Sequence, residues 1–220
     1  MTSVFTSSIG KKLLMSLAGF FLVLFLLVHM SINLLLILAD DSMVYNRAAH
    51  FMSTNLAVKV FEVVLFGGLL LHIIYALILQ VQNWISRPKG YRRNNHSQES
   101  FFSKYMIHTA AIIFVFLAIH MMDFYFKAKF GHAPEITFNG VRMHDFASEV
   151  QDKFHISGFV IFYIAAFIFL GFHLVHGFHS FFKTIGIGNK KLSTFFEILA
   201  VIYAIIIVGG FSAIPLFIYF

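Results

Sequence analysis

The fold of this chain is decided by the stretch Phe169-Leu170-Gly171-Phe172-His173-Leu174-Val175-His176-Gly177-Phe178-His179. It closes a long apolar run that begins near Ile156, so His173 is predicted to lie deep inside a membrane helix. An ionisable side chain at that depth is costly and is by default a candidate for function. Three other apolar runs carry one such histidine each, at His29, His72 and His120. Four histidines on four predicted spans are the main functional signal of the sequence.

The composition indicates an integral membrane protein. Of the 220 residues, 59% are hydrophobic, only 12% are charged and 30 are phenylalanine. The apolar residues occur in runs long enough to cross a bilayer, unlike the interrupted pattern of a soluble core. The lack of cysteine excludes disulfides and any zinc or iron–sulfur site with cysteine ligands. The net charge of +6 belongs to the loops between spans, so no nucleic-acid partner is expected.

Five apolar runs lie along the chain, and each has about 20 residues or more, the length that a helix needs to cross ~30 Å. We expect an all-α membrane protein in which five transmembrane helices form one domain, residues 1–220. The helices are expected at roughly residues 12–39, 57–84, 104–127, 154–183 and 192–219. The first run is too long for the apolar region of a signal peptide and should be retained. Between the third and fourth runs, Pro134 and Gly140 argue against a continuous helix.

The charges in the loops predict the orientation. The N-terminus and the second and fourth loops share one side of the membrane and hold ten of the 16 Lys and Arg residues. These ten are Lys11, Lys12, Arg87, Lys89, Arg92, Arg93, Lys104, Lys183, Lys190 and Lys191. The other side holds eight of the ten acidic residues. By the positive-inside rule the N-terminus is cytoplasmic and the C-terminus external.

Position along each helix gives the depth of three of the four histidines. At ~1.5 Å per residue, His29 and His120 lie roughly 25 Å beyond the last lysine before their spans, which places both in the outer half. His173 lies roughly 15 Å from the lysine at the inner boundary, whereas the depth of His72 stays ambiguous. We therefore expect two stacked pairs, His29 with His120 and His72 with His173.

Two such pairs are suited to two haems, because haem iron takes two axial imidazoles and helix bundles hold it between facing side chains. His176 is an alternative ligand on the fourth helix or a partner for a haem propionate, and His179 should lie near the headgroups. Small residues on three of the helices would give a haem room, although glycines in membrane helices also simply let helices approach. These glycines are Gly19, Gly67, Gly68, Gly158, Gly171 and Gly177.

Four segments resemble a known family in their order and spacing. They are Ser16-Leu17-Ala18-Gly19-Phe20 followed by Phe25-Leu26-Leu27-Val28-His29-Met30-Ser31-Ile32-Asn33-Leu34, then Leu71-His72-Ile73-Ile74-Tyr75-Ala76, Ile119-His120-Met121-Met122-Asp123-Phe124, and His173-Leu174-Val175-His176-Gly177 with Gly186 thirteen residues beyond His173. Over essentially its whole length the chain resembles the cytochrome b membrane anchor of succinate:quinone oxidoreductases, in the five-helix dihaem group that includes fumarate reductases.

The resemblance implies a ligand set. His29 and His120 would be the axial ligands of the iron of an outer haem b, and His72 and His173 those of an inner haem b. The family's fourth ligand lies four residues before a glycine, here Gly177, which favours His173 over His176.

The resemblance also implies partners and a location. The anchor of this family binds an iron–sulfur subunit on its cytoplasmic face, and that subunit carries a flavoprotein subunit that interconverts succinate and fumarate. Electrons pass between the iron–sulfur clusters, the haems and a membrane quinone, expected to be menaquinone. The chain would thus be a subunit of succinate dehydrogenase or fumarate reductase, an electron-transport enzyme linked to the tricarboxylic acid cycle, in the bacterial cytoplasmic membrane. The basic loop Arg87–Arg93 is expected either to help bind the iron–sulfur subunit or simply to fix the topology.

One position departs from the family pattern. Some dihaem members have a glutamate two residues before the ligand on the fourth helix, thought to carry protons across the membrane, and here that position is Gly171. Without it, electron transfer between the haems is expected to be coupled to the membrane potential. For a quinone near the outer haem, Glu62 and Asp123 are the candidate proton-exchanging residues, and Lys59, Tyr45 and His50 lie nearby in the sequence.

Two other functions stay open. One is the cytochrome b subunit of another respiratory complex, such as a hydrogenase or a formate dehydrogenase, which co-purifying subunits would distinguish. The other is a metal-ion permease that uses histidine and methionine as ligands. A permease would more often show carboxylates or methionines along a continuous path, whereas here the polar residues at membrane depth are nearly all single histidines.

Overall fold

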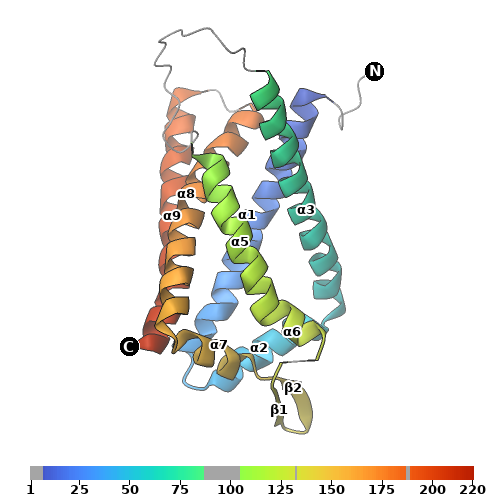
Figure 1. The fold of residues 1–220 in the computed structure, drawn as a ribbon, viewed down its shortest axis with the longest axis vertical. Helices are drawn as coiled ribbons and strands as arrows, with labels where there is room; N and C mark the ends of the chain where they lie inside the picture. The colour runs from blue at the N-terminus through green and yellow to red at the C-terminus, as the bar shows by residue number, and fades with distance from the viewer. Residues whose placement is uncertain (1–6, 87–104, 132, 187–188) are drawn as a thin grey trace.

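The computed structural model describes residues 7–86, 105–131, 133–186 and 189–220 and is mostly helical. Among these residues, five long helical spans run along the long axis of the molecule (Figure 1). They are α1 (Ser8–Leu38), α3 (Leu56–Ile85), α5 (Met106–His120) with its continuations, α8 (Ser157–Thr184) and α9 (Lys190–Tyr219). Within these described ranges, five helices are long and apolar enough to cross a membrane, as the sequence predicts for a multi-pass membrane protein. The first helix begins at Ser8 rather than near residue 12, and the other ends differ from the expected ranges by three residues or fewer.

The third span is not a uniform α-helix. After α5 the chain forms a π-helical turn, η1 (Met121–Tyr125), and then a short helix, α6 (Phe126–Lys129). The amide of Phe126 donates to the carbonyl of Met121, five residues earlier, which is the hydrogen bond of a π-turn. Such turns occur often at functional sites, and this one follows directly after His120.

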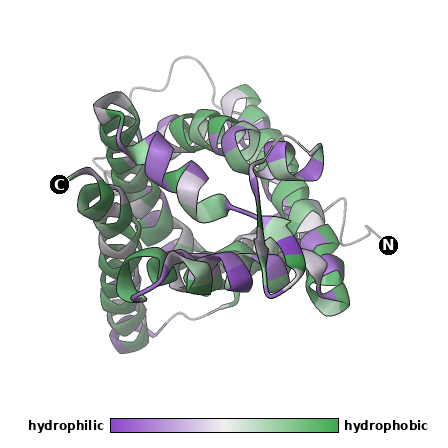
Figure 2. Ribbon diagram, turned by 90° about the horizontal axis from the view of Figure 1, so that it is seen from below, coloured by the Kyte–Doolittle hydropathy of each residue, from purple (hydrophilic) through white to green (hydrophobic). Residues whose placement is uncertain are grey.

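The connections at the C-terminal end of the bundle form a folded layer, called here the cap. It consists of α2 (Ser42–Thr54), the antiparallel hairpin β1 (Glu135–Phe138) and β2 (Val141–His144), and α7 (Phe146–Phe154). These elements lie across the bundle at that end (Figure 1). Figure 2 shows the cap from below, with hydrophilic segments over the apolar helices. The sequence predicts polar loops here, and the structure adds two helices and a hairpin.

Short polar side chains explain where several helices begin. Asp41 accepts a hydrogen bond from Met43 N at 2.8 Å at the start of α2, and Asn55 does the same for α3. Asp145 accepts from Ser148 N at 3.2 Å at the start of α7. These side chains satisfy amide groups that the first turn of a helix leaves free. In the hairpin, Asn139 and Gly140 have φ values of 49° and 78°, so a left-handed turn joins the strands.

The core lies between α1, α5, α8 and α9. Ile207 is fully buried and Tyr163 is 2% exposed, and α8 packs along the length of α9. In contrast, α3 packs mainly against α1, and none of its residues is buried. The apolar side chains of α3 and α9 that remain exposed are suited to lipid. In α9 the helix continues through Pro215.

Candidate functional site

The structure brings together His29 of α1 and His120 of α5, named here the cap-side pair. Their ring centroids lie 5.8 Å apart, and their ring planes cross at 82°. Both rings are partly buried. Phe25 and Phe116 stack on the two histidines, with centroid distances of 5.2 Å and 5.7 Å, and hold the rings in place.

His72 of α3 and His173 of α8 form a second pair, the opposite pair, farther from the cap. Their ring centroids are 6.3 Å apart at an interplanar angle of 75°. The Nδ1 atom of His72 lies 3.3 Å from the carbonyl oxygen of Met15, which favours a proton on Nδ1 and leaves Nε2 free to bind a metal. A Cβ atom on Gly19 would lie only 3.1 Å from Cε1 of His72, so Gly19 makes room for this ring.

The geometry of both pairs can be tested against haem iron. An imidazole nitrogen binds a metal at about 2 Å, and the ring centroid lies about 1 Å behind that nitrogen, so two axial imidazoles on one iron have centroids about 6 Å apart. The observed 5.8 Å and 6.3 Å agree with this separation. The nearly perpendicular planes also exclude face-to-face stacking of the rings. Each pair therefore has the ring separation that two axial ligands of one haem iron require.

The other histidines of α8 have partners of their own. The Nε2 atom of His176 lies 3.2 Å from the hydroxyl of Ser180, and Nε2 of His179 lies 2.9 Å from a carboxylate oxygen of Glu197. The ring that faces His72 is that of His173. The geometry thus favours His173 over His176 as the ligand from α8.

Of the glycines proposed to make room for haem, only Gly19 lies against one of the four histidines. Gly171 instead allows α8 and α9 to approach, since a Cβ there would lie 2.7 Å from Cγ2 of Val208. A Cβ atom on Gly68 would lie 3.6 Å from Cδ1 of Phe21. An added Cβ would meet nothing within 4 Å at Gly67, Gly158 or Gly177.

The two candidate quinone residues each pair with a cation at the cap end of the bundle. Glu62 accepts a hydrogen bond from the hydroxyl of Tyr125 and lies 3.4 Å from Nζ of Lys129. Asp123 lies 2.8 Å from Nζ of Lys153. The sequence did not point to Tyr125, Lys129 or Lys153. Helical periodicity in the sequence could not reveal these contacts, because the π-turn changes which residues after His120 lie on the same face of the helix.

The other residues near these candidates in the sequence lie in different settings. The charge of Lys59, one turn before Glu62, acts on that carboxylate. Tyr45 instead donates to Asn33 Oδ1 at 3.4 Å, and the side-chain amide of Asn33 lies 3.5 Å from Nδ1 of His29. Burial, with the charge of Glu149 as a second cause, raises the pKa of Tyr45 to about 12. The Tyr45 hydroxyl therefore stays protonated and keeps donating to Asn33. Among the described residues no hydrogen bond joins His50 to Glu62.

The loop Arg87–Arg93 lies outside the described residues. Within the part of the chain that the structure describes, no three His, Asp or Glu side chains gather closely enough to hold a metal ion by themselves.

Comparison of the chain with known protein families, with characterised proteins and with solved structures gives no match. The resemblance to the cytochrome b anchors therefore stays a prediction.

Proposed function

We propose that this chain is a dihaem cytochrome b and the quinone-reactive membrane anchor of a succinate dehydrogenase or fumarate reductase. The observation that carries the proposal is the pairing of four histidines from four spans at separations of 5.8 Å and 6.3 Å. Bound haem would supply one-electron redox chemistry at each pair.

The residues of the chain have three tasks in this proposal. The four imidazoles bind and orient the two haems, and the carbonyl of Met15 fixes the tautomer of His72. The apolar side chains around both pairs exclude water, which tunes the redox potential. At the cap end, the ion pairs of Glu62 and Asp123 provide carboxylates that can exchange protons with a quinone.

The proposed orientation follows from charge. Among the described residues, the end opposite the cap carries five lysines (Lys11, Lys12, Lys183, Lys190 and Lys191) and one acidic residue, Glu197, whereas the cap end carries six basic and eight acidic residues. We therefore assign the lysine-rich end to the cytoplasm and the cap to the outside of a bacterial cytoplasmic membrane. The cap-side pair would then hold the outer haem. The iron–sulfur subunit, with the flavoprotein subunit on it, would bind at the lysine-rich end.

The Val208 side chain next to Gly171 supports the proposal that this protein has no transmembrane proton path through α8. A glutamate at position 171 would collide with α9, because even a Cβ lies 2.7 Å from Val208. With no proton moving alongside, an electron that crosses from one haem to the other moves charge through the membrane potential, at about 2.3 kcal/mol per 100 mV for a full crossing.

Purification of the tagged protein in mild detergent tests the proposal. An iron–sulfur subunit and a flavoprotein subunit should co-purify, and succinate should reduce the haems. Haems that are reduced by hydrogen or formate, with the matching subunits, would assign the chain to another respiratory complex. A chain without haem that binds transition-metal ions would instead support the permease.

A further inference from the structure

Buried polar groups cluster between the cap-side pair and the cap. Four side-chain atoms there are buried and have no hydrogen-bond partner among the described residues: Nδ1 of His120, Oδ2 of Asp123, the hydroxyl of Tyr163 and Oε2 of Glu149. Leaving a buried polar atom unpaired costs about 1–3 kcal/mol, so such atoms in a native protein usually bind water. Four of them in one region indicate bound water rather than an isolated packing defect.

These groups connect His120 to α7. The ring centroids of Tyr163 and His120 lie 6.3 Å apart. The Tyr163 hydroxyl is close enough to Asp123 for the charge of that carboxylate to act on it. Asp123 in turn pairs with Lys153 of α7 at 2.8 Å, and these two side chains are only 18% and 15% exposed. The charged and titratable groups that interact with Asp123 among the described residues are thus Lys153 from α7 and Tyr163 from α8.

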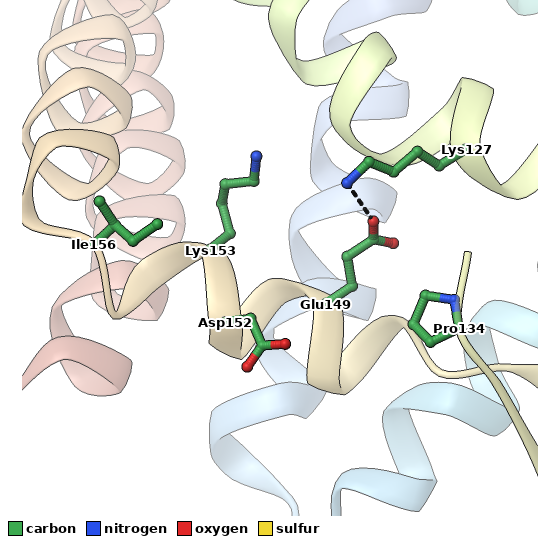
Figure 3. A pocket seen from close by; sticks show the side chains of 6 residues that line it. All are labelled: Lys127, Pro134, Glu149, Asp152, Lys153 and Ile156. Atoms are coloured by element: carbon green, nitrogen blue, oxygen red, sulfur yellow. Dashed lines mark hydrogen bonds and ion pairs between the residues drawn. The ribbon is translucent and has the colours of Figure 1, made fainter. Parts of the chain in front are cut away.

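A cavity continues this connection to the surface. It has a volume of about 310 Å³, opens to the outside, and is lined by Lys127, Pro134, Glu149, Asp152, Lys153 and Ile156 (Figure 3). Lys127 reaches across to Glu149, whose carboxylate oxygen Oε1 accepts at 2.9 Å. Glu149 is 8% exposed, and its second oxygen has no partner among the described residues. At about 30 Å³ per water molecule, the cavity has room for several.

We propose that the cluster of Asp123, Lys153, Tyr163 and Glu149 holds ordered water and carries protons between the cap-side pair and this cavity. The inference rests on the proposed function. A quinol oxidised beside the cap-side pair becomes a quinone and releases two electrons and two protons. A haem held by the cap-side pair would accept the electrons one at a time, and each proton leaves the quinol oxygen for Asp123. From Asp123 it passes through water beside Lys153 and Glu149 into the cavity, and quinone reduction runs the same path in reverse.

The test uses the complete complex with its partner subunits. Asp123→Asn combined with Lys153→Met removes the acid without leaving a buried lysine unpaired, and Asp123→Glu is the conservative variant. The control is Glu135→Gln with Arg142→Met, which removes an ion pair on the outer face of the hairpin at the same end. The measurements are haem content, reduction by dithionite, and the rate of haem reduction by a quinol in H₂O and in D₂O.

We expect unchanged haem content and dithionite reduction in every variant. Quinol-driven reduction should slow by at least roughly tenfold in Asp123→Asn/Lys153→Met, with a larger solvent isotope effect, because a positioned acid–base group has been lost. Asp123→Glu should recover most of the rate, and the hairpin control should behave as the wild type. A double variant with the wild-type rate and isotope effect would overturn the route.

A second readout does not depend on haem or quinone. Hydroxyl radicals made from bound water by X-ray pulses should oxidise Tyr163, although it is only 2% exposed, and should oxidise it less in the double variant. If Tyr163 is not labelled, the cluster does not hold water and the route is wrong. A wild-type protein that lacks haem but shows this labelling would contradict the proposed function alone.

Discussion

Each of the four paired histidines comes from a different helix, and in the proposed assignment the removal of one would leave its partner without a second axial ligand. His173→Ala or His72→Ala should lose the haem of the opposite pair and keep that of the cap-side pair. Because cofactor binding stabilises the folded state, these variants should also assemble less well. The haem-to-protein ratio of each purified variant is the measurement.

The matched control is His176→Ala, one turn away on α8. His176 already has Ser180 as a partner at 3.2 Å and does not face His72, so both haems should remain. Loss of one haem in this variant, with both kept in His173→Ala, would reverse the choice of ligand.

For individual residues, the sequence predicted the pairing of the histidines but not the residues that surround them. The depth of each histidine sufficed to pair His29 with His120, because both lie at nearly the same distance along their helices from a lysine at the helix end. It could not place Lys153 beside Asp123, since that contact depends on how α7 folds back across the bundle. Tyr163 was not singled out either, because a tyrosine in an aromatic-rich apolar run has no distinguishing pattern.

Asn46, a buried residue of α2, links α2 to the start of α7 through two hydrogen bonds. Asn46 is 2% exposed, donates to Asp145 Oδ1 at 2.7 Å and accepts from Ala147 N at 2.9 Å. Asn46→Ala would leave the amide of Ala147 buried and unpaired, and we expect a loss of about 1–3 kcal/mol in the stability of the cap.

Limited proteolysis of the segment from residue 130 to residue 156 measures this effect, with Ser53→Ala as the control. Ser53 is on the same helix, and its exposed hydroxyl donates to the carbonyl of His50 one turn earlier, so its removal should change little. Equal cleavage rates in the two variants would contradict the role of Asn46.

The contact between α8 and α9 depends on the missing side chain at Gly171. Gly171→Ala should reduce thermal stability by about 1–3 kcal/mol, because its Cβ would lie 2.7 Å from Cγ2 of Val208. Combining it with Val208→Ala removes the clash, so the double variant should be more stable than the sum of the single changes predicts. Strictly additive effects in thermal unfolding would show that the two residues do not share this contact.

The long helices were predictable because apolar length alone specifies a membrane span. The cap was not, because α2 and α7 are short and polar on average, and the contacts that hold them depend on the tertiary fold. These contacts are the hydrogen bonds of Asn46 and the packing of Val150 and Phe154 in the core. The π-turn after His120 likewise leaves no signature in residue type.

For the whole molecule, the proposed orientation can be tested because the chain has no cysteine. A single Thr137→Cys in the hairpin should react with a membrane-impermeant maleimide added to intact spheroplasts. Thr194→Cys, at the opposite end of the bundle, should react only after the membrane is opened. The reverse pattern would place the cap in the cytoplasm and invert the assignment of the two haems.

The most direct test of the dihaem assignment is a reduced-minus-oxidised visible spectrum of the purified protein, taken with a haem-to-protein ratio and a redox titration. The two histidine pairs predict two low-spin b-type haems per chain that titrate separately. One haem would mean that one pair does not bind iron. No haem in protein purified with its partners, without loss of cofactor, would contradict the cytochrome assignment.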